Sequence, residues 1–393
     1  MKHNAELPKI KMWNKIKTYI ILIAAAISLG CIAWYFNQHM PWFGKKASPS
    51  LPISRPMNGS WHAFYADQGI LKEEKFEDWT QRIQRNNPNY WRFWLTQLQS
   101  LRSETAYPLL KSPPVDSLIK DVSSMWDSDH PEIKSAKNSL FEVLARYHSL
   151  QKITESFIQD HSNQPANPGS PSKNSESTKP LEIIGMVGLF QYQTALTSST
   201  LWLGLDMFMN EGYRYYPSVD HLYQYQRRRT APSYLPVAVA RTLAEDWVNE
   251  NITNPSENGN TLIDQIIREG KTLACMRWLL PEIHDTLLLG YSASQWNWIK
   301  SNQVEVWRDL VSQDLLFSGD PSTLSRYLSD GPFSSGYPEQ SPPALGLFIG
   351  DAVIQKWILS DRESQRNPPW IIMLENRNLP SSQILKKSGY KGR

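Results

Sequence analysis

The chain has 393 residues, of which 40% are hydrophobic, enough for one large domain or two ordinary ones. Its 41 Lys and Arg residues and 38 Asp and Glu residues give a net charge of +3. Such a balance predicts no nucleic-acid partner, because nucleic-acid binders usually carry a strong basic excess. A mean hydropathy of −0.47 excludes a polytopic membrane protein. Two cysteines exclude a disulfide scaffold and any zinc site built from several thiolates.

The N-terminal region carries the clearest signal for a membrane segment. Residues 18–36, "TYIILIAAAISLGCIAWYF", form an apolar run of 19 residues without charge, and five lysines precede it. A membrane-spanning helix needs about 20 residues. Lysines in front of the run predict that the N-terminus is cytoplasmic, so that the remaining chain is extracytoplasmic.

Two forms of this membrane attachment stay open. The run is either an uncleaved inner-membrane signal anchor or a lipoprotein signal that ends with lipidation of Cys31. Gly30 suits a lipoprotein cleavage site, whereas Ser28 does not, because an aliphatic residue is usual there. The apolar residues that follow Cys31 favour the anchor.

The rest of the chain divides by composition. Residues 41–60 contain four prolines and are typical of a tether. Residues 161–180, "HSNQPANPGSPSKNSESTKP", are polar and predict a flexible surface insert. The predicted organisation is a membrane segment at 1–40, the tether at 41–60, a helical region at 61–160, the insert at 161–180 and a second region at 181–393, with 61–393 as one folded unit.

The periodicity of apolar residues predicts a mainly helical α+β fold. Two apolar runs bounded by small polar residues, "LEIIGMVGLFQYQTA" and "STLWLGLDMF", predict two strands in a hairpin. Ser292 and Gln295 form a capping box, and Asp320-Pro321 is a helix start. Helices are expected at Leu71–Asn86, Val115–Met125, from Pro131 with a stripe of Leu140, Val143, Leu144, Tyr147, Leu150, Ile153 and Phe157, at Leu235–Trp247, Thr261–Leu280, Ser292–Val311 and Ala344–Leu359.

Motifs for chemistry are missing. None of the eight histidines forms an i, i+4 pair, so the His-Glu-x-x-His zinc motif does not occur. There is also no Gly-x-Ser-x-Gly elbow and no phosphate-binding glycine loop. We therefore expect no catalytic residue, no metal site and no cofactor.

Three features are candidate sites with two interpretations each. Arg227, Arg228 and Arg229 are either solvated or paired with carboxylates, or they form a docking patch for an acidic partner. Glu269 lies near the apolar face of its helix, where it is either partnered by an arginine or an old ligand position. The tyrosines around the arginines pack in the core or form a carbohydrate- or peptide-binding surface. These are Tyr213, Tyr215, Tyr216, Tyr223 and Tyr225.

The second half contains a run of distinctive segments in a fixed order. They are "LWLGLDMFMNEGYRYYP", "YQRRRTAPSYLPVAVARTLAEDW", "NTLIDQIIREGKTLACMRWLLPE", "LLGYSASQWNWIKSNQVEVWRDLVSQDLLFSGDP", "YLSDGPFSSGYPEQSPPALGLFIGDAVIQKWI" and "ILKKSGYKGR". In order and spacing they resemble the gliding motility lipoproteins B (GldB) of Bacteroidota. The resemblance implies a lipid-anchored envelope protein needed for gliding and for the associated type IX secretion machinery.

That family is itself similar to predicted zinc-dependent proteases with a His-Glu-x-x-His helix and a later helix bearing Glu-Gly. Glu269-Gly270-Lys271 matches the later element, whereas the stretch Pro236–Trp247, which corresponds to the earlier helix, holds no histidine. Catalytic zinc needs three protein ligands. The resemblance therefore implies a zincin-like body that has lost its metal, with Glu269 as a vestigial ligand position.

The sequence predicts a non-catalytic component of the gliding and type IX secretion machinery that acts through contacts with other envelope proteins. Two alternatives stay open. One is an aromatic-rich binder of envelope glycan or peptide, and the other is a membrane-anchored hydrolase with an unrecognised site.

Overall fold

The computed structural model describes residues 115–162, 181–252, 259–360 and 368–393, except for 189, 191, 198, 199, 220 and 221. All of them belong to one compact unit, Ser54–Arg393. The expected membrane segment with Cys31, the tether, the helix Leu71–Asn86 and most of the insert lie outside the described residues. Among the residues described, no helix combines the length and the apolar character needed to cross a membrane.

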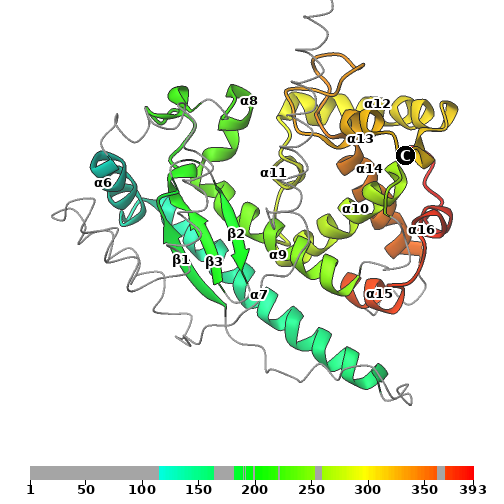
Figure 1. The fold of residues 1–393 in the computed structure, drawn as a ribbon, viewed down its shortest axis with the longest axis horizontal. Helices are drawn as coiled ribbons and strands as arrows, with labels where there is room; N and C mark the ends of the chain where they lie inside the picture. The colour runs from blue at the N-terminus through cyan, green and yellow to red at the C-terminus, as the bar shows by residue number, and fades with distance from the viewer. Residues whose placement is uncertain are drawn as a thin grey trace, which may run out of the picture. The chain divides into compact units, whose positions relative to one another are not determined.

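The described part is mainly helical, as expected, with one small sheet (Figure 1). Its α-helices are α6 (Val115–Trp126), α7 (Pro131–Ser162), α8 (Gln224–Arg227), α9 (Leu235–Asn251), α10 (Leu262–Leu279), α11 (Asp285–Leu289), α12 (Ala293–Ser312), α13 (Pro321–Leu328), α14 (Leu345–Ser360), α15 (Pro369–Glu375) and α16 (Ser381–Ser388). The predicted starts at Pro131, Ser292 and Asp320 are confirmed. Helix α7 also includes the first two residues of the predicted insert.

The buried face of α7 differs from the predicted stripe at its C-terminal end. Leu150 is buried, but Ile153 is 39% exposed, and Thr154 is buried in its place. Thr154 can be buried because its hydroxyl donates to the Leu150 carbonyl oxygen at 2.7 Å and accepts from the Trp247 indole N–H at 3.0 Å. A buried polar side chain whose hydrogen bonds are satisfied avoids the cost of desolvation. The position of residue 154 on the helix, and not its hydrophobicity, therefore decides that it faces the core.

The sheet has three strands, not the two predicted. Strands β1 (Glu182–Met186), β2 (Thr194–Thr197) and β3 (Thr200–Gly204) lie in the order β1-β3-β2. Strands β2 and β3 form an antiparallel hairpin, but β1, the strand within the first predicted run, pairs with β3 in parallel, so the predicted hairpin is confirmed only in part. The run expected as one strand breaks after β1 because Phe190 adopts a left-handed φ of 63°.

The buried carboxylate of Asp206 holds the break between β1 and β2. Asp206 lies two residues after the end of β3 and accepts hydrogen bonds from the backbone N–H groups of Gly188 at 2.9 Å and Phe190 at 2.6 Å. Burial raises the pKa of Asp206 to about 6, although the two backbone donors favour the charged form. This carboxylate therefore has a structural role in the sheet.

Helix α9 packs against β2 and against α10, and α10 packs most extensively against α14 (Figure 1). The α10–α14 crossing depends on glycine. A Cβ atom at Gly270 would lie 2.2 Å from the Gly350 carbonyl oxygen, and one at Gly350 would lie 2.2 Å from the Ile266 carbonyl oxygen. Only residues without a Cβ allow the two backbones to approach this closely.

Candidate binding site

Helix α8 is a single turn that begins where the Gln226 side chain accepts a hydrogen bond from the Tyr223 N–H at 3.0 Å. The chain then continues into the 3₁₀ helix η4 (Arg228–Thr230). Thr230 is fully buried, and its hydroxyl donates to the Arg227 carbonyl oxygen at 2.6 Å. These bonds fix the backbone that carries the exposed Tyr223, the half-buried Tyr225 and the arginine run.

Two of the three arginines bind groups inside the structure. Arg228 donates to the Gly290 carbonyl oxygen at 2.6 Å and to the Gln295 side chain at 3.2 Å. Burial, and secondarily the neighbouring Arg229, lowers the pKa of Arg228. Arg229 holds both oxygens of Asp330, at 2.8 and 3.2 Å. The interpretation as paired arginines thus describes Arg229, and the docking patch stays a prediction.

The segment that follows α13 forms the wall opposite the tyrosines. The Gln295 side chain, which is buried, donates to the Pro332 carbonyl oxygen at 2.8 Å while it accepts from Arg228. Further along the same segment, the Ser334 hydroxyl donates to the Pro342 carbonyl oxygen at 2.9 Å. The loop that carries Asp330, Gly331 and Pro332 is therefore held by side-chain bonds to the protein body.

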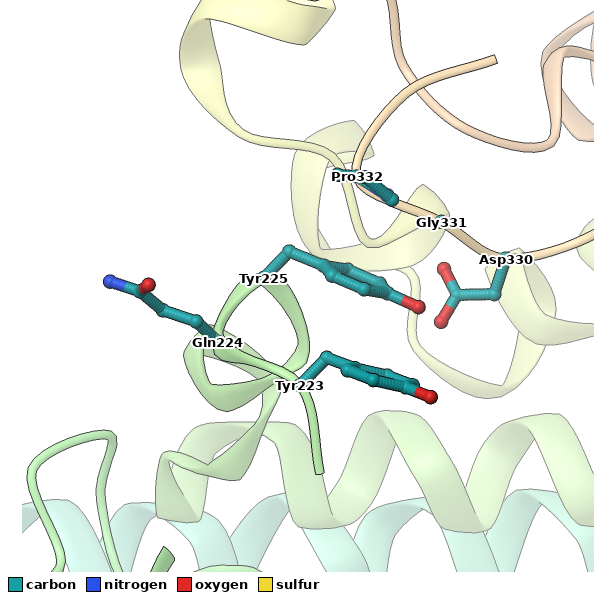
Figure 2. A pocket seen from close by; sticks show the side chains of 6 residues that line it. All are labelled: Tyr223, Gln224, Tyr225, Asp330, Gly331 and Pro332. Atoms are coloured by element: carbon teal, nitrogen blue, oxygen red, sulfur yellow. The ribbon is translucent and has the colours of Figure 1, made fainter. Parts of the chain in front are cut away.

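Between these two elements lies an open pocket of about 690 Å³. It is lined by Tyr223, Gln224, Tyr225, Asp330, Gly331 and Pro332. Figure 2 shows the two tyrosine rings one above the other, with their hydroxyl ends directed to the side where Asp330 lies. The ring centroids are 5.9 Å apart and the planes differ by 7°. Tyr223 is 59% exposed, so an aromatic surface is open to solvent.

Asp330 is the charged residue of this pocket. Burial disfavours its charged form, but the bonds from Arg229 and Gln226 outweigh that effect and hold the pKa of Asp330 below its usual value. The same carboxylate contributes to a raised pKa of Tyr225, for which burial is the larger cause. Asp330 is therefore an anion paired with a cation, and the hydroxyl of Tyr225 is neutral.

The other tyrosines named from the sequence do not join this pocket. Tyr213 and Tyr216 pack edge-on with centroids 5.3 Å apart, and both contact Phe190. Tyr216 is fully buried, and its hydroxyl donates to the Asp206 carbonyl oxygen at 2.9 Å. Tyr215 packs edge-on against Tyr213. The three residues form an aromatic cluster in which Tyr216 belongs to the core and the half-buried Tyr213 and Tyr215 pack against it.

Glu269 has an arginine partner. The Arg241 guanidinium on α9 binds the Glu269 carboxylate on α10 and also donates to Glu245 at 2.5 Å. The Glu269 side chain is 23% exposed. Across the described residues no three His, Cys, Asp or Glu side chains lie close enough together to hold a metal ion.

The remaining perturbed groups near α9 and α10 have structural explanations. Tyr147 donates to Asp246 at 3.2 Å. Burial, with a smaller contribution from Glu250, raises the pKa of Asp246 to about 6. Cys275 is 1% exposed, and burial raises the pKa of its thiol, so the thiol is unreactive.

Sequence reasoning named Tyr223 and Tyr225 but missed Asp330, Gly331 and Pro332. No motif marks these three, since the Asp330 carboxylate meets Arg229 only through the tertiary fold, 101 residues away in sequence. The signal for the pocket that the sequence did offer was the pair Tyr223 and Tyr225, two residues apart and just before the arginine run.

The comparisons with known proteins give one family. The family described as gliding motility protein GldB matches residues 172–392, which confirms the resemblance seen in the sequence. No curated protein matches the chain, and no solved structure matches it. The matched residues include the sheet, the arginine run, the α9–α10–α14 core and the pocket, and the chain belongs to the gliding motility protein GldB family.

Proposed function

We propose that this protein serves gliding motility as a non-catalytic component of the cell envelope that acts by contact with other envelope proteins. Family membership supports the motility role. The observation that carries the non-catalytic part is the Arg241–Glu269 ion pair. In this pair Arg241 binds Glu269, the one carboxylate that the sequence resemblance marks as a former metal ligand.

The charge around Glu269 supports this reading. Arg241 lies on α9, the helix that the resemblance aligns with the zinc-binding helix of the related proteases. A guanidinium remains charged at any accessible pH and would repel a metal cation bound at the same carboxylate. A catalytic zinc ion also needs three protein ligands. Helix α9 contains no histidine and therefore supplies no imidazole ligand.

The membrane attachment is part of the same proposal. The apolar run at 18–36 and the lysines before it support an extracytoplasmic position for the folded unit. That position would place the protein among the periplasmic parts of the gliding and type IX secretion machinery. Intact-mass measurement of the native protein tests the form of attachment, because lipidation at Cys31 removes the preceding residues and adds a diacylglycerol.

Genetic complementation tests the function. In the source bacterium we expect deletion of the gene to abolish colony spreading on agar and the wild-type gene to restore it. Glu269→Gln keeps the shape of the side chain and removes its charge, so a contact-based function should tolerate it. Immunoblotting reports whether the variant reaches wild-type abundance.

A metal-dependent hydrolase would behave differently. It would lose spreading with Glu269→Gln at normal abundance, and the purified full-length protein would contain stoichiometric zinc by elemental analysis. Either result contradicts the proposal. Arg241→Lys serves as the matched control, because it retains a cation beside Glu269 and alters only the geometry of the pair.

A second candidate function is binding of an envelope glycan. The exposed ring of Tyr223, which lies parallel to the half-buried ring of Tyr225, favours it.

A further inference from the structure

We propose that the pocket formed by Tyr223, Gln224, Tyr225 and Asp330 binds a neutral glycan, with a sugar ring stacked on the exposed tyrosine surface. This inference rests on the second candidate function, for which it names the site, and it does not depend on how the protein contributes to gliding.

The first support is the prepared aromatic surface. The Tyr223 and Tyr225 rings already pack against each other in a parallel, offset geometry, with centroids 5.9 Å apart. A ligand therefore does not have to order two free side chains, which reduces the entropic cost of binding. The apolar C–H face of a pyranose ring fits a flat aromatic ring, and the exposed Tyr223 provides that ring.

The second support is the kind of polar group at the pocket. Tyr223 and Tyr225 line it with two hydroxyl groups that point to the same side, whereas the Gln224 amide points away from them (Figure 2). Each of these groups both donates and accepts hydrogen bonds. Sugar hydroxyls have the same double capacity, so the polar edge of a glycan would find matching partners around the aromatic surface.

The third support is the local charge. Asp330 is bound through both oxygens by Arg229 and accepts a further bond from Gln226 at 3.1 Å. Asp330 is the charged residue among those that line the pocket, and its pairing with Arg229 offsets its charge, which favours an uncharged ligand over a basic peptide. The pocket of about 690 Å³ lies in the usual range for small-molecule sites, about 300–1,000 Å³.

A proline-rich peptide is the competing ligand, since such peptides also dock on aromatic residues. A polyproline helix advances about 3.1 Å per residue and is read by a series of aromatic pockets along a groove. The residues here surround a single pocket.

The test uses the full-length protein, purified without sugar-based detergent. Saturation-transfer NMR is recorded with triacetylchitotriose, maltotriose and cellotriose as separate probes. We expect at least one of them to bind, and Tyr223→Ala to weaken that binding by about two- to tenfold, the usual worth of one aromatic contact. Tyr223→Phe retains the ring and should retain most of the binding.

Phe317→Ala is the matched control, because Phe317 is 56% exposed, close to the exposure of Tyr223, and does not line the pocket. It should leave binding unchanged. Failure of all three sugars to bind would overturn the proposal, and so would binding that Tyr223→Ala does not weaken. Preferential binding of a PxxP peptide at Tyr223 would assign the pocket to a peptide instead. None of these outcomes alters the spreading assay, so the two proposals fail separately.

Discussion

Replacing Gly350 with alanine should strongly destabilise the protein. The new Cβ atom would lie 2.2 Å from the Ile266 carbonyl oxygen and 3.0 Å from the Gly270 backbone nitrogen, whereas ordinary contacts begin near 3.4 Å. Helices α10 and α14 would have to separate by roughly 1.2 Å, because both obstructing atoms belong to the backbone and no rotamer change relieves them. Overpacking of this kind costs about 1–3 kcal/mol or more.

Alanine has a higher helix propensity than glycine, and this difference offsets about 1 kcal/mol of the packing cost. A backbone clash places the packing cost at or above the upper end of its range, so we expect Gly350→Ala to lower the free energy of unfolding by about 2–3 kcal/mol. Urea denaturation of the full-length protein, followed by circular dichroism, measures it. Gly212→Ala is the control, since a Cβ atom there would meet no atom within 4 Å. A loss below about 0.5 kcal/mol in Gly350→Ala would refute the close-packing argument.

Three further changes test the polar network of the core. Arg241→Ala leaves the partly buried Glu269 carboxylate without its ion pair and should cost about 1–2 kcal/mol in urea denaturation, whereas the double variant Arg241→Ala, Glu269→Gln should recover part of that loss. Because the pKa of Asp246 is raised to about 6 in the folded protein, this carboxyl keeps its proton between about pH 4 and 6, where the unfolded chain has already lost it. The free energy of unfolding should therefore fall by about 1–2 kcal/mol as the pH rises from about 4 to 6, and Asp246→Asn should reduce this slope in a pH series. Thr154→Val leaves the buried indole N–H of Trp247 without an acceptor and should cost about 1–2 kcal/mol by thermal melting, with Thr154→Ser close to wild type.

Local signals in the sequence predicted the helix starts well. Ser292 and Gln295 form the expected capping box, with the Ser292 hydroxyl accepting from the Gln295 N–H at 3.2 Å. Asp320 likewise accepts from the Thr323 N–H at 2.9 Å. Such bonds join residues three apart, so their geometry follows from the helix itself and needs no knowledge of the fold.

Long-range partners could not be predicted in the same way. The third strand depends on a turn at Phe190, and the carboxylate that stabilises this turn belongs to Asp206, 16 residues later. Thr154 replaces Ile153 on the buried face of α7 because Trp247, 93 residues away, supplies a hydrogen bond. A pattern of polar and apolar residues contains no information about such partners, which explains why the strand count and the end of the stripe were wrong.

The glycine packing and the candidate pocket are connected through α13. A Cβ atom at Gly346 would lie 2.7 Å from the Leu328 side chain and 2.9 Å from the Tyr327 carbonyl oxygen, at the last turn of α13. Asp330 follows Leu328 by two residues, so a displacement of this turn would move the pocket wall. We therefore expect Gly346→Ala to lower stability and to weaken glycan binding together. Gly270→Ala clashes with α14 alone. It should lower stability but leave glycan binding at the wild-type level, when binding is measured about 20 °C below the unfolding midpoint of the variant. Equal binding by both variants would show that α13 does not position the pocket wall.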